Sequence, residues 1–364
     1  MMCAKAEQHG SGGLASRRFA NRFFWVASGV LAAVCVAGLG TELPASEIAP
    51  YVPPSSEFHF RVERFDTNPL IHRDLEGLEG PLGRNINGPS LIRVPEWIDK
   101  PLGTYYLYFA HHHGQFIRLA YADDLAGPWQ IYAGGVLPME QTPIYRGRRG
   151  DHVASPDVHI DAENERLVMY YHGPNPPGGP GGQGTYVALS RDGLEFESRE
   201  EYLGWFYFRV FQHDGWHYAL AKYGNDGGIL YRSRDGLTDF ERGPRILPRV
   251  RHKALWKHGG MLYVFFSRGH DEPEHILVSR VENLADDWHD WRFTEPQTVL
   301  RPEEPYEGAE EPIRESRFGA TYDFVHQLRD PAIYEEDGRL FLLYSTAGEH
   351  ALAAAEITLV EEKR

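Results

Sequence analysis

The feature that most constrains the fold is a pattern of apolar and aromatic segments that recurs along most of the chain, about every 40 to 50 residues. Each unit begins with a short apolar segment, often opened by proline, and continues through a turn into a segment that ends in aromatic residues. A third segment, rich in alanine, serine and leucine, follows. The turn after it has the same sequence, Ser-Arg-Asp-Gly-Leu, at 190–194 and 233–237. Such a period indicates a repeat architecture in which each unit is one small sheet.

Five units can be counted, and no convincing amphipathic helix follows residue 60. Aromatic residues make up 13% of the chain and Gly/Pro turns are frequent, which is typical of short-stranded β structures. We therefore predict an all-β fold, a five-bladed β-propeller formed by residues 87–364. The innermost strands of its blades are expected to begin near Gly88, Ser155, Phe208, Lys253 and Asp330.

The fifth unit ends without an obvious fourth strand, so the ring needs a strand from elsewhere in the chain. An open sheet edge invites association with other chains, and propellers often close with a strand from the opposite terminus. Residues 58–65 have the alternating character of such a strand. We predict that they pair with the fifth unit, within an N-terminal segment that spans residues 46–86.

An N-terminal signal segment, residues 1–45, is predicted to precede the propeller. An apolar run, Phe23–Gly40, follows three arginines, and Ala45 offers one cleavage point. This arrangement is typical of a secretory signal. A membrane anchor is the alternative, because the run is about the ~18 residues at which a spanning helix can form. Either reading places the rest of the chain outside the cytoplasm, in the periplasm or secreted.

The charge and cysteine content narrow the class of partner. The chain has 52 acidic and 37 basic residues, a net charge of −15 at pH 7. Phosphate binding requires a basic surface, so this balance argues against nucleic acid as a partner. Both cysteines, Cys3 and Cys35, fall in the predicted signal segment, which leaves the propeller without a disulfide or a cysteine metal site.

Polar and charged side chains lie where the innermost strands begin. In a propeller these positions converge on the central channel, although they are distant in sequence. A purely structural ring would usually place small or apolar residues there. Here the positions carry carboxylate, imidazole, amide and guanidinium groups, namely Asn87, His152, Asp157, Arg209, Arg251, His252, Arg329 and Asp330.

The repeat, together with Arg329-Asp330-Pro331, resembles the five-bladed propeller glycoside hydrolases of the arabinanase and β-xylosidase type, family 43, with a weaker likeness to invertase-type enzymes. The resemblance covers about residues 87–356. It implies that Asp330, in an Asp-Pro motif, orients the sugar and tunes pKa values, and that Glu307, in a Glu-Gly motif, is the acid. Asp157 offers a second inner-strand carboxylate.

The first unit departs from the family pattern. The family places its Asp-Pro base there, whereas this chain has Asn87-Gly88-Pro89, and an amide cannot act as a general base. Glycoside cleavage needs two carboxyl groups, one to protonate the leaving oxygen and, in inverting enzymes, one to activate water. Either the carboxylates have been redistributed among the blades, or hydrolysis is altered or lost.

We nevertheless predict an exported glycoside hydrolase that cleaves an oligo- or polysaccharide by acid/base chemistry. Its catalytic residues would be Asp330, Asp157 and Glu307, and its substrate-binding residues Asn87, His111, His152, Arg209, His252, Arg268 and Arg329. The arginines could bind a carboxylated or sulfated sugar through forked contacts. A non-catalytic carbohydrate-binding propeller and a polysaccharide lyase remain alternatives.

The sequence specifies no cofactor. His111–His113 could form a metal site with His152 or His252, but hydrogen-bonded or surface histidines are more common, and no metal ligand is predicted. A structural calcium ion in the central channel is left open. The identity of the sugar, the stereochemical outcome and the oligomeric state are not determined by these patterns.

Overall fold

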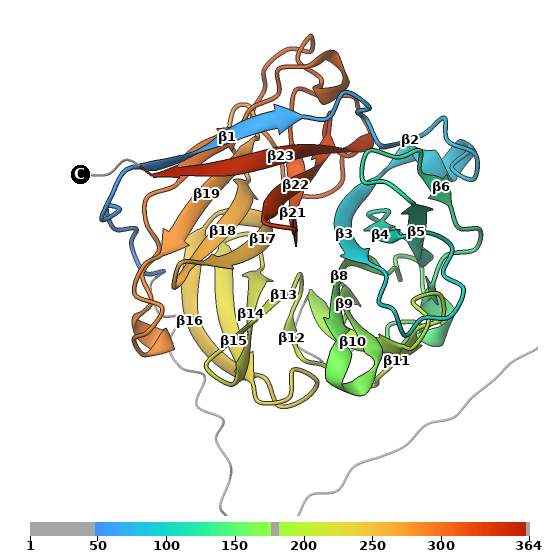
Figure 1. The fold of residues 1–364 in the computed structure, drawn as a ribbon, viewed down its shortest axis with the longest axis horizontal. Helices are drawn as coiled ribbons and strands as arrows, with labels where there is room; N and C mark the ends of the chain where they lie inside the picture. The colour runs from blue at the N-terminus through green and yellow to red at the C-terminus, as the bar shows by residue number, and fades with distance from the viewer. Residues whose placement is uncertain (1–47, 176–181, 362–364) are drawn as a thin grey trace, which may run out of the picture. The chain divides into compact units, whose positions relative to one another are not determined.

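The structure is a computed structural model that describes residues 48–175 and 182–361. The predicted signal or anchor at residues 1–45 lies outside the described residues. Within the described residues, no helix has both the length and the apolar character needed to cross a membrane. Five antiparallel sheets surround a central channel, which confirms the predicted five-bladed propeller (Figure 1).

Blades one and two are each built from four consecutive strands with a short extra strand at the edge. Blade one contains β3 (Asn87–Arg93), β4 (Tyr105–Ala110), β5 (Phe116–Ala122), β6 (Gln130–Ile131) and β7 (Leu137–Pro138). Blade two contains β8 (Ala154–Asp161), β9 (Arg166–Pro174), β10 (Gln183–Ser190), β11 (Glu197–Ser198) and β12 (Gly204–Trp205).

Blades three and four are four-stranded meanders. Blade three contains β13 (Arg209–His213), β14 (Trp216–Tyr223), β15 (Gly227–Ser233) and β16 (Glu241–Pro248). Blade four contains β17 (Val250–His258), β18 (Met261–Arg268), β19 (Ile276–Val281) and β20 (Gln297–Leu300). Short 3-10 helices occur in the connections: η1 (Gly80–Arg84), η2 (Met139–Gln141), η3 (Ala162–Asn164), η4 (Trp288–Asp290) and η5 (Pro305–Glu307).

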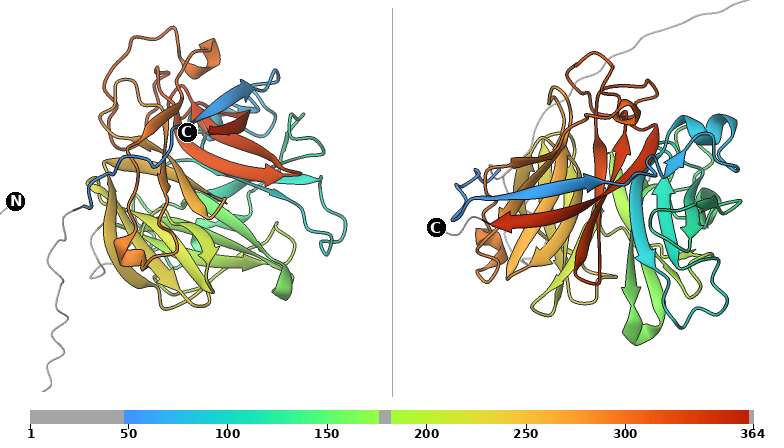
Figure 2. Two further views of the ribbon diagram at one scale, coloured as in Figure 1. Left: turned by 60° about the vertical axis from the view of Figure 1, so that its left-hand side comes forward. Right: turned by 45° about the horizontal axis from the view of Figure 1, so that its top comes forward.

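Blade five joins the two ends of the described chain. It contains β21 (Arg329–Glu336), β22 (Arg339–Thr346), β23 (Ala351–Glu361), β1 (Phe58–Arg64) and β2 (Ile71–His72). β1 pairs with β23 over its whole length, with Phe58 opposite Glu361 and Arg64 opposite Ala355, and the two strands lie side by side in every view (Figure 2). The pairing predicted for this segment is therefore present.

The apolar face of β1 also packs blade five against blade four. The Phe60 side chain is 7% exposed, and its ring centroid lies 5.1 Å from that of Phe265, 6.0 Å from Tyr263 and 6.2 Å from Trp256. His59, the next residue along the strand, is exposed. The alternation seen in the sequence thus reflects one face in the core and one in solvent.

Truncating this face should weaken the whole domain. We expect Phe60→Ala to lower the free energy of unfolding by about 3–5 kcal/mol, as for other large-to-small changes of buried aromatic residues. Chemical denaturation followed by fluorescence would measure it. The matched change on the solvent face, His59→Ala, should have little effect. Equal losses for the two variants would mean that β1 does not hold the blades together.

The innermost strands share an irregularity that directs side chains into the channel. The strand register shifts at the start of this strand in blades one, two, four and five. A residue at or beside this point has a left-handed backbone in four blades: Gly88 (φ 60°), Ser155 (φ 51°), Tyr207 (φ 69°) and Asp330 (φ 47°). Bulges of this kind re-aim a side chain. The repeat thus brings one position per blade toward the same space.

Candidate functional site

A pocket of about 280 Å³ lies at the channel and receives residues from all five blades. Four of the predicted site residues line it: Asn87, His152, His252 and Asp330. The remaining lining residues are His112, Ala154, Ser155, His172, Gln183, Phe206, Tyr207, Lys222, Asn225, Arg251, Phe318 and Gly319. Most of these carry hydrogen-bonding groups, so the pocket suits a polar ligand that makes many directional contacts.

Asp330 contributes a carboxylate to this pocket and is 2% exposed. Its Oδ1 accepts a hydrogen bond from the Tyr207 hydroxyl at 2.5 Å and lies 2.9 Å from His252 Nδ1. Its Oδ2 accepts a longer hydrogen bond, 3.3 Å, from the Ser345 hydroxyl. Oδ1 is therefore occupied by protein groups, whereas Oδ2 keeps capacity for another donor.

The surroundings of Asp330 favour its ionised form. Burial alone would raise the pKa of this carboxyl, but the His252 and Tyr207 contacts outweigh burial and lower it below its usual value. Burial lowers the pKa of His252 to about 4, so its imidazole is neutral near pH 7. The Nδ1 atom of this neutral ring faces the Asp330 carboxylate, which favours the tautomer that is protonated at Nδ1.

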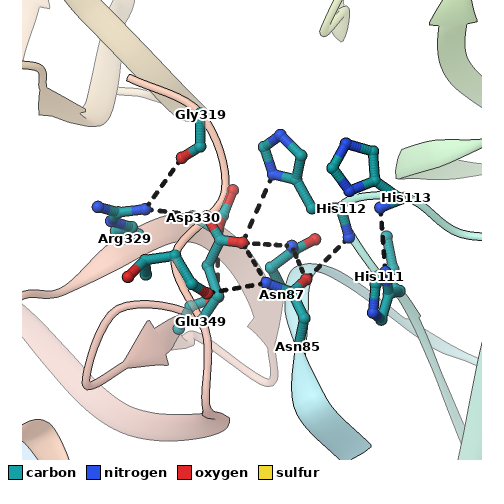
Figure 3. Close-up of polar contacts among 12 residues, drawn as sticks. Asn85, Asn87, His111, His112, His113, Gly319, Arg329, Asp330 and Glu349 are labelled. Atoms are coloured by element: carbon teal, nitrogen blue, oxygen red, sulfur yellow. Dashed lines mark hydrogen bonds and ion pairs between the residues drawn. The ribbon is translucent and has the colours of Figure 1, made fainter. Parts of the chain in front are cut away.

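Glu349 is a second buried acid beside the pocket, and sequence analysis did not identify it. It is fully buried in the turn after β22, and its oxygens accept hydrogen bonds from Arg329 (2.9 Å), Asn85 (2.5 Å) and Asn87 (3.1 Å) (Figure 3). His112 Nδ1 lies 3.5 Å away. Although burial opposes ionisation, the His112 and Arg329 contacts hold the pKa of Glu349 well below its usual range. Glu349 thus anchors two pocket residues, Asn87 and His112.

Comparison with known proteins gives one relative in sequence. No family model matches the chain. The chain is 33% identical over 326 residues to the uncharacterized protein R118 of Acanthamoeba polyphaga mimivirus. The aligned residues make up 81% of this chain and 90% of that protein. The chain belongs to the family of protein R118. That relative's description assigns no activity.

Solved structures support the fold. The catalytic domain of a GH62 α-L-arabinofuranosidase from Coprinopsis cinerea superposes with a TM-score of 0.53, at 13% identity, covering 84% of this chain and 98% of that one. A GH43_1 enzyme from Xanthomonas citri gives 0.52, at 12% identity and 76% and 87% coverage. A thermostable family-43 glycoside hydrolase gives 0.50, at 15% identity and 77% and 93% coverage. The resemblance inferred from the repeat is confirmed at the level of the fold.

The backbone of blade one accounts for the absence of an aspartate base in that blade. Gly88 occupies the bulge position that Asp330 occupies in blade five. A Cβ at residue 88 would lie 3.2 Å from the Cα of Ser155 and 3.4 Å from its hydroxyl oxygen. An aspartate at this position would crowd the backbone of the neighbouring blade. In this family member, blade one contributes the amide of Asn87 instead.

Asp157 has a different place from the one predicted. It does not line the pocket; its Oδ2 accepts hydrogen bonds from the Val210 backbone N–H at 2.9 Å and from His159 Nε2 at 2.9 Å. It follows the bulge of blade two by two residues, and Ser155 faces the pocket in its stead. Asp157 therefore links blade two to blade three, and its position gives no support to a catalytic role.

Glu307 also lies outside the pocket lining, so its position gives no support to its predicted role as the acid. It is fully buried at the end of η5, and its oxygens accept hydrogen bonds from Arg64 (2.9 and 3.1 Å), the Tyr344 hydroxyl (2.8 Å) and two backbone N–H groups. Every partner is part of the protein. Its physical role is to tie the η5 segment to β1 and β22 of blade five.

We expect Glu307→Gln to affect stability and not turnover. Loss of the charged partner of Arg64 should cost about 1.5–3 kcal/mol of unfolding free energy, the range for hydrogen bonds to charged groups. Thermal denaturation would register the change. Glu303 also pairs with Arg64 at 3.2 Å but is largely exposed, so Glu303→Gln should cost less. A loss of activity in folded Glu307→Gln protein would restore a role in chemistry.

The predicted arginines have protein partners. Arg329 bridges Glu349 and Glu274, and Arg251 contacts Glu274 and donates to the carbonyls of residues 317 and 319. Arg209 donates to backbone carbonyls, including that of Lys253 at 3.0 Å. Arg268 pairs with Asp271 at 3.1 Å. Of these four arginines, only Arg251 lines the pocket.

The histidines are divided between the pocket and its margin. His111 does not line the pocket; its Nδ1 accepts the backbone N–H of His113, and burial lowers its pKa to about 4. His152 does line it and contacts the Gly150 carbonyl and the Gln183 side chain. Over residues 48–175 and 182–361, no three His, Cys, Asp or Glu side chains are grouped so as to hold a metal ion.

Proposed function

We propose that this protein is a glycoside hydrolase whose central pocket binds a sugar and presents its glycosidic bond to Asp330. The observation that carries the proposal is the ionised Asp330 carboxylate, held by Tyr207 and His252, in a polar pocket built by all five blades. The fold is shared with proteins described as family-43 and GH62 glycoside hydrolases, which supports the same class of substrate.

In this proposal Asp330 is the general base. Its less occupied oxygen, Oδ2, takes a proton from a water molecule, whose oxygen attacks the anomeric carbon. The bond between that carbon and the leaving oxygen breaks, and the electron pair stays on the leaving oxygen. The leaving oxygen then needs a proton from a second group.

His112 is the pocket residue best suited to supply that proton. Its Nδ1 lies 3.5 Å from the buried Glu349 carboxylate, which orients the imidazole, and its side chain is 28% exposed. Burial lowers the pKa of His172 and of His252 below the usual value, so these two imidazoles are less suited to supply a proton. Glu349 acts through His112 and is a positioning residue.

The test is product release. Purified protein would be incubated with a panel of plant, algal and microbial oligosaccharides and polysaccharides, and new reducing ends would be measured. We expect release from at least one class, abolished by His112→Gln and by loss of the Asp330 charge. Absence of release across the panel, with no binding, would remove the proposal.

A non-catalytic carbohydrate-binding propeller is the second candidate, and one observation favours it. Among the described residues that line the pocket, Asp330 is the single carboxylate, whereas the usual glycosidase mechanism employs two. Binding of an oligosaccharide without any product would support this alternative. We also propose export of the protein, on the basis of the apolar run at residues 23–40.

A further inference from the structure

Lys222 is a buried lysine that faces the pocket from β14 of blade three. Its side chain is 6% exposed and lines the pocket. Its Nζ lies 5.3 Å from the centre of the Phe206 ring and 4.7 Å from that of Phe318. In the part of the chain that the structure describes, Nζ makes no hydrogen bond and no ion pair. Its close neighbours are thus two aromatic faces and no hydrogen-bond acceptor.

This distinguishes Lys222 from the other cation of the pocket. Arg251 is compensated by Glu274 and by two backbone carbonyls. Asp330, the single carboxylate among the described residues of the lining, already accepts from Tyr207 and Ser345 and faces His252. Lys222 therefore has unfilled hydrogen-bonding capacity directed at the space where a ligand would lie.

The electrostatic environment of Lys222 determines which kind of ligand group this ammonium binds best. The pKa of Lys222 is lowered to about 7, mainly by burial and in part by Arg251 and Arg329, while Glu274 and Asp330 oppose this shift. A desolvated ammonium without a polar partner gains most from a ligand that brings a negative charge. The low dielectric between two phenyl rings strengthens that attraction.

We infer that Lys222 binds an anionic substituent of the sugar, so that the ligand of the pocket is a carboxylated or sulfated carbohydrate. The inference rests on the proposed function, in that it takes the pocket to be a carbohydrate site. The anionic group lies toward blade three, beside Lys222 and the Asn225 amide, which also lines the pocket. Repulsion from Asp330 keeps the same group away from blade five, so the charge pair orients the sugar.

Lys222, and not the arginines predicted from the sequence, then selects the charge of the ligand. The sequence pointed to arginines at the starts of the inner strands, and their guanidinium groups are held by glutamates and backbone carbonyls. Lys222 lies on the second strand of its blade, inside a run of apolar residues. Selection by a lysine also favours a point contact with the anion over a forked one.

The experiment compares matched ligands by titration calorimetry. The probes are oligosaccharides that contain glucuronic or galacturonic acid, the same oligosaccharides after reduction of their carboxyl groups, and a sulfated set. For the wild type we expect acidic probes to bind about 10-fold or more tightly than reduced ones, as for a charge-assisted hydrogen bond. Comparison of the carboxylated and sulfated sets identifies the anion.

Lys222→Met is the decisive variant, because it keeps much of the side-chain volume and removes the charge. It should lose most of the preference for acidic probes while binding the reduced probes as the wild type does. Lys257→Met, which removes an exposed lysine of β17, should keep the preference. Since Lys222→Met deletes an unpaired buried charge, its melting temperature should not fall; if it does, Lys222→Gln replaces it.

Two results would overturn the inference. Equal wild-type affinity for acidic and reduced probes would exclude selection for charge, and a preference that persists in Lys222→Met would assign it elsewhere. Both results leave the proposed carbohydrate site intact, because the reduced probes still bind. If neither kind of probe binds or is cleaved, the proposed function itself fails, and the inference falls with it.

Discussion

Replacing Asp330 by asparagine is expected to reduce turnover of a glycoside by about 100-fold or more, the scale of general acid–base catalysis. The change keeps the size of the side chain and removes its charge. Asparagine also tolerates the left-handed backbone of residue 330, where φ is 47°, so the bulge should survive. Steady-state kinetics and thermal denaturation of the same preparation would test both halves of this expectation.

Asp157→Asn is the matched control for that experiment. Asp157 also lies at the start of an inner strand, yet its partners are Val210 and His159, outside the pocket. We expect its replacement to leave turnover intact and to cost a little stability. Unchanged turnover in Asp330→Asn would exclude a catalytic role for Asp330. Loss of folding together with activity would make it a structural cap of blade five.

The largest expected effect on stability comes from Arg329→Met. Arg329 is 2% exposed and lies within 3.2 Å of Glu274 and 2.9 Å of Glu349, both fully buried. Removing Arg329 takes from the buried carboxylates of Glu274 and Glu349 a positive charge that pairs with both of them. Breaking a buried ion pair from one side typically costs about 3–5 kcal/mol, and we expect at least that loss in denaturant titrations.

A control variant and the pH dependence of stability provide further tests of the role of Arg329. Arg339→Met removes a surface pair with Glu356 and should cost about 1 kcal/mol or less. Because the pKa of Glu349 is depressed in the folded state, its contribution to stability is present above the usual carboxyl range and is lost as pH falls. The wild type should therefore lose stability in acid more steeply than Arg329→Met. Parallel pH profiles would contradict the proposed coupling.

Much of the fold could be predicted because the signal is local and repeated. Each blade carries the same succession of strand and turn, and the alternation of Phe58 to Arg64 indicated a strand with one buried face. Asp330 could be identified for the same reason, since the start of an inner strand has a known direction in a propeller. These features depend on neighbours in sequence or on their place in the repeat.

The rest of the site depends on partners that are remote in sequence. Glu307 follows a run of acidic residues, and nothing nearby shows that Arg64, more than 200 positions earlier, occupies its carboxylate. Glu349 and Lys222 lie at or just after the second strand of a blade, whereas the repeat predicts a direction toward the channel only for the starts of the first strands.

The pairing of β1 with β23 has a consequence for how the molecule is made. Phe58 and Glu361 lie about 300 residues apart. During synthesis, β1 therefore emerges long before β23, the strand with which it pairs. At about 5–20 residues per second that interval is on the order of 15–60 s. During it, the edge of β1 has no partner, and the aromatic side chain of Phe60 lacks the cover of blade four. The growing chain thus exposes an unpaired strand edge, which can associate with other chains, until β23 has been synthesised. Assistance by a chaperone should matter most in that interval.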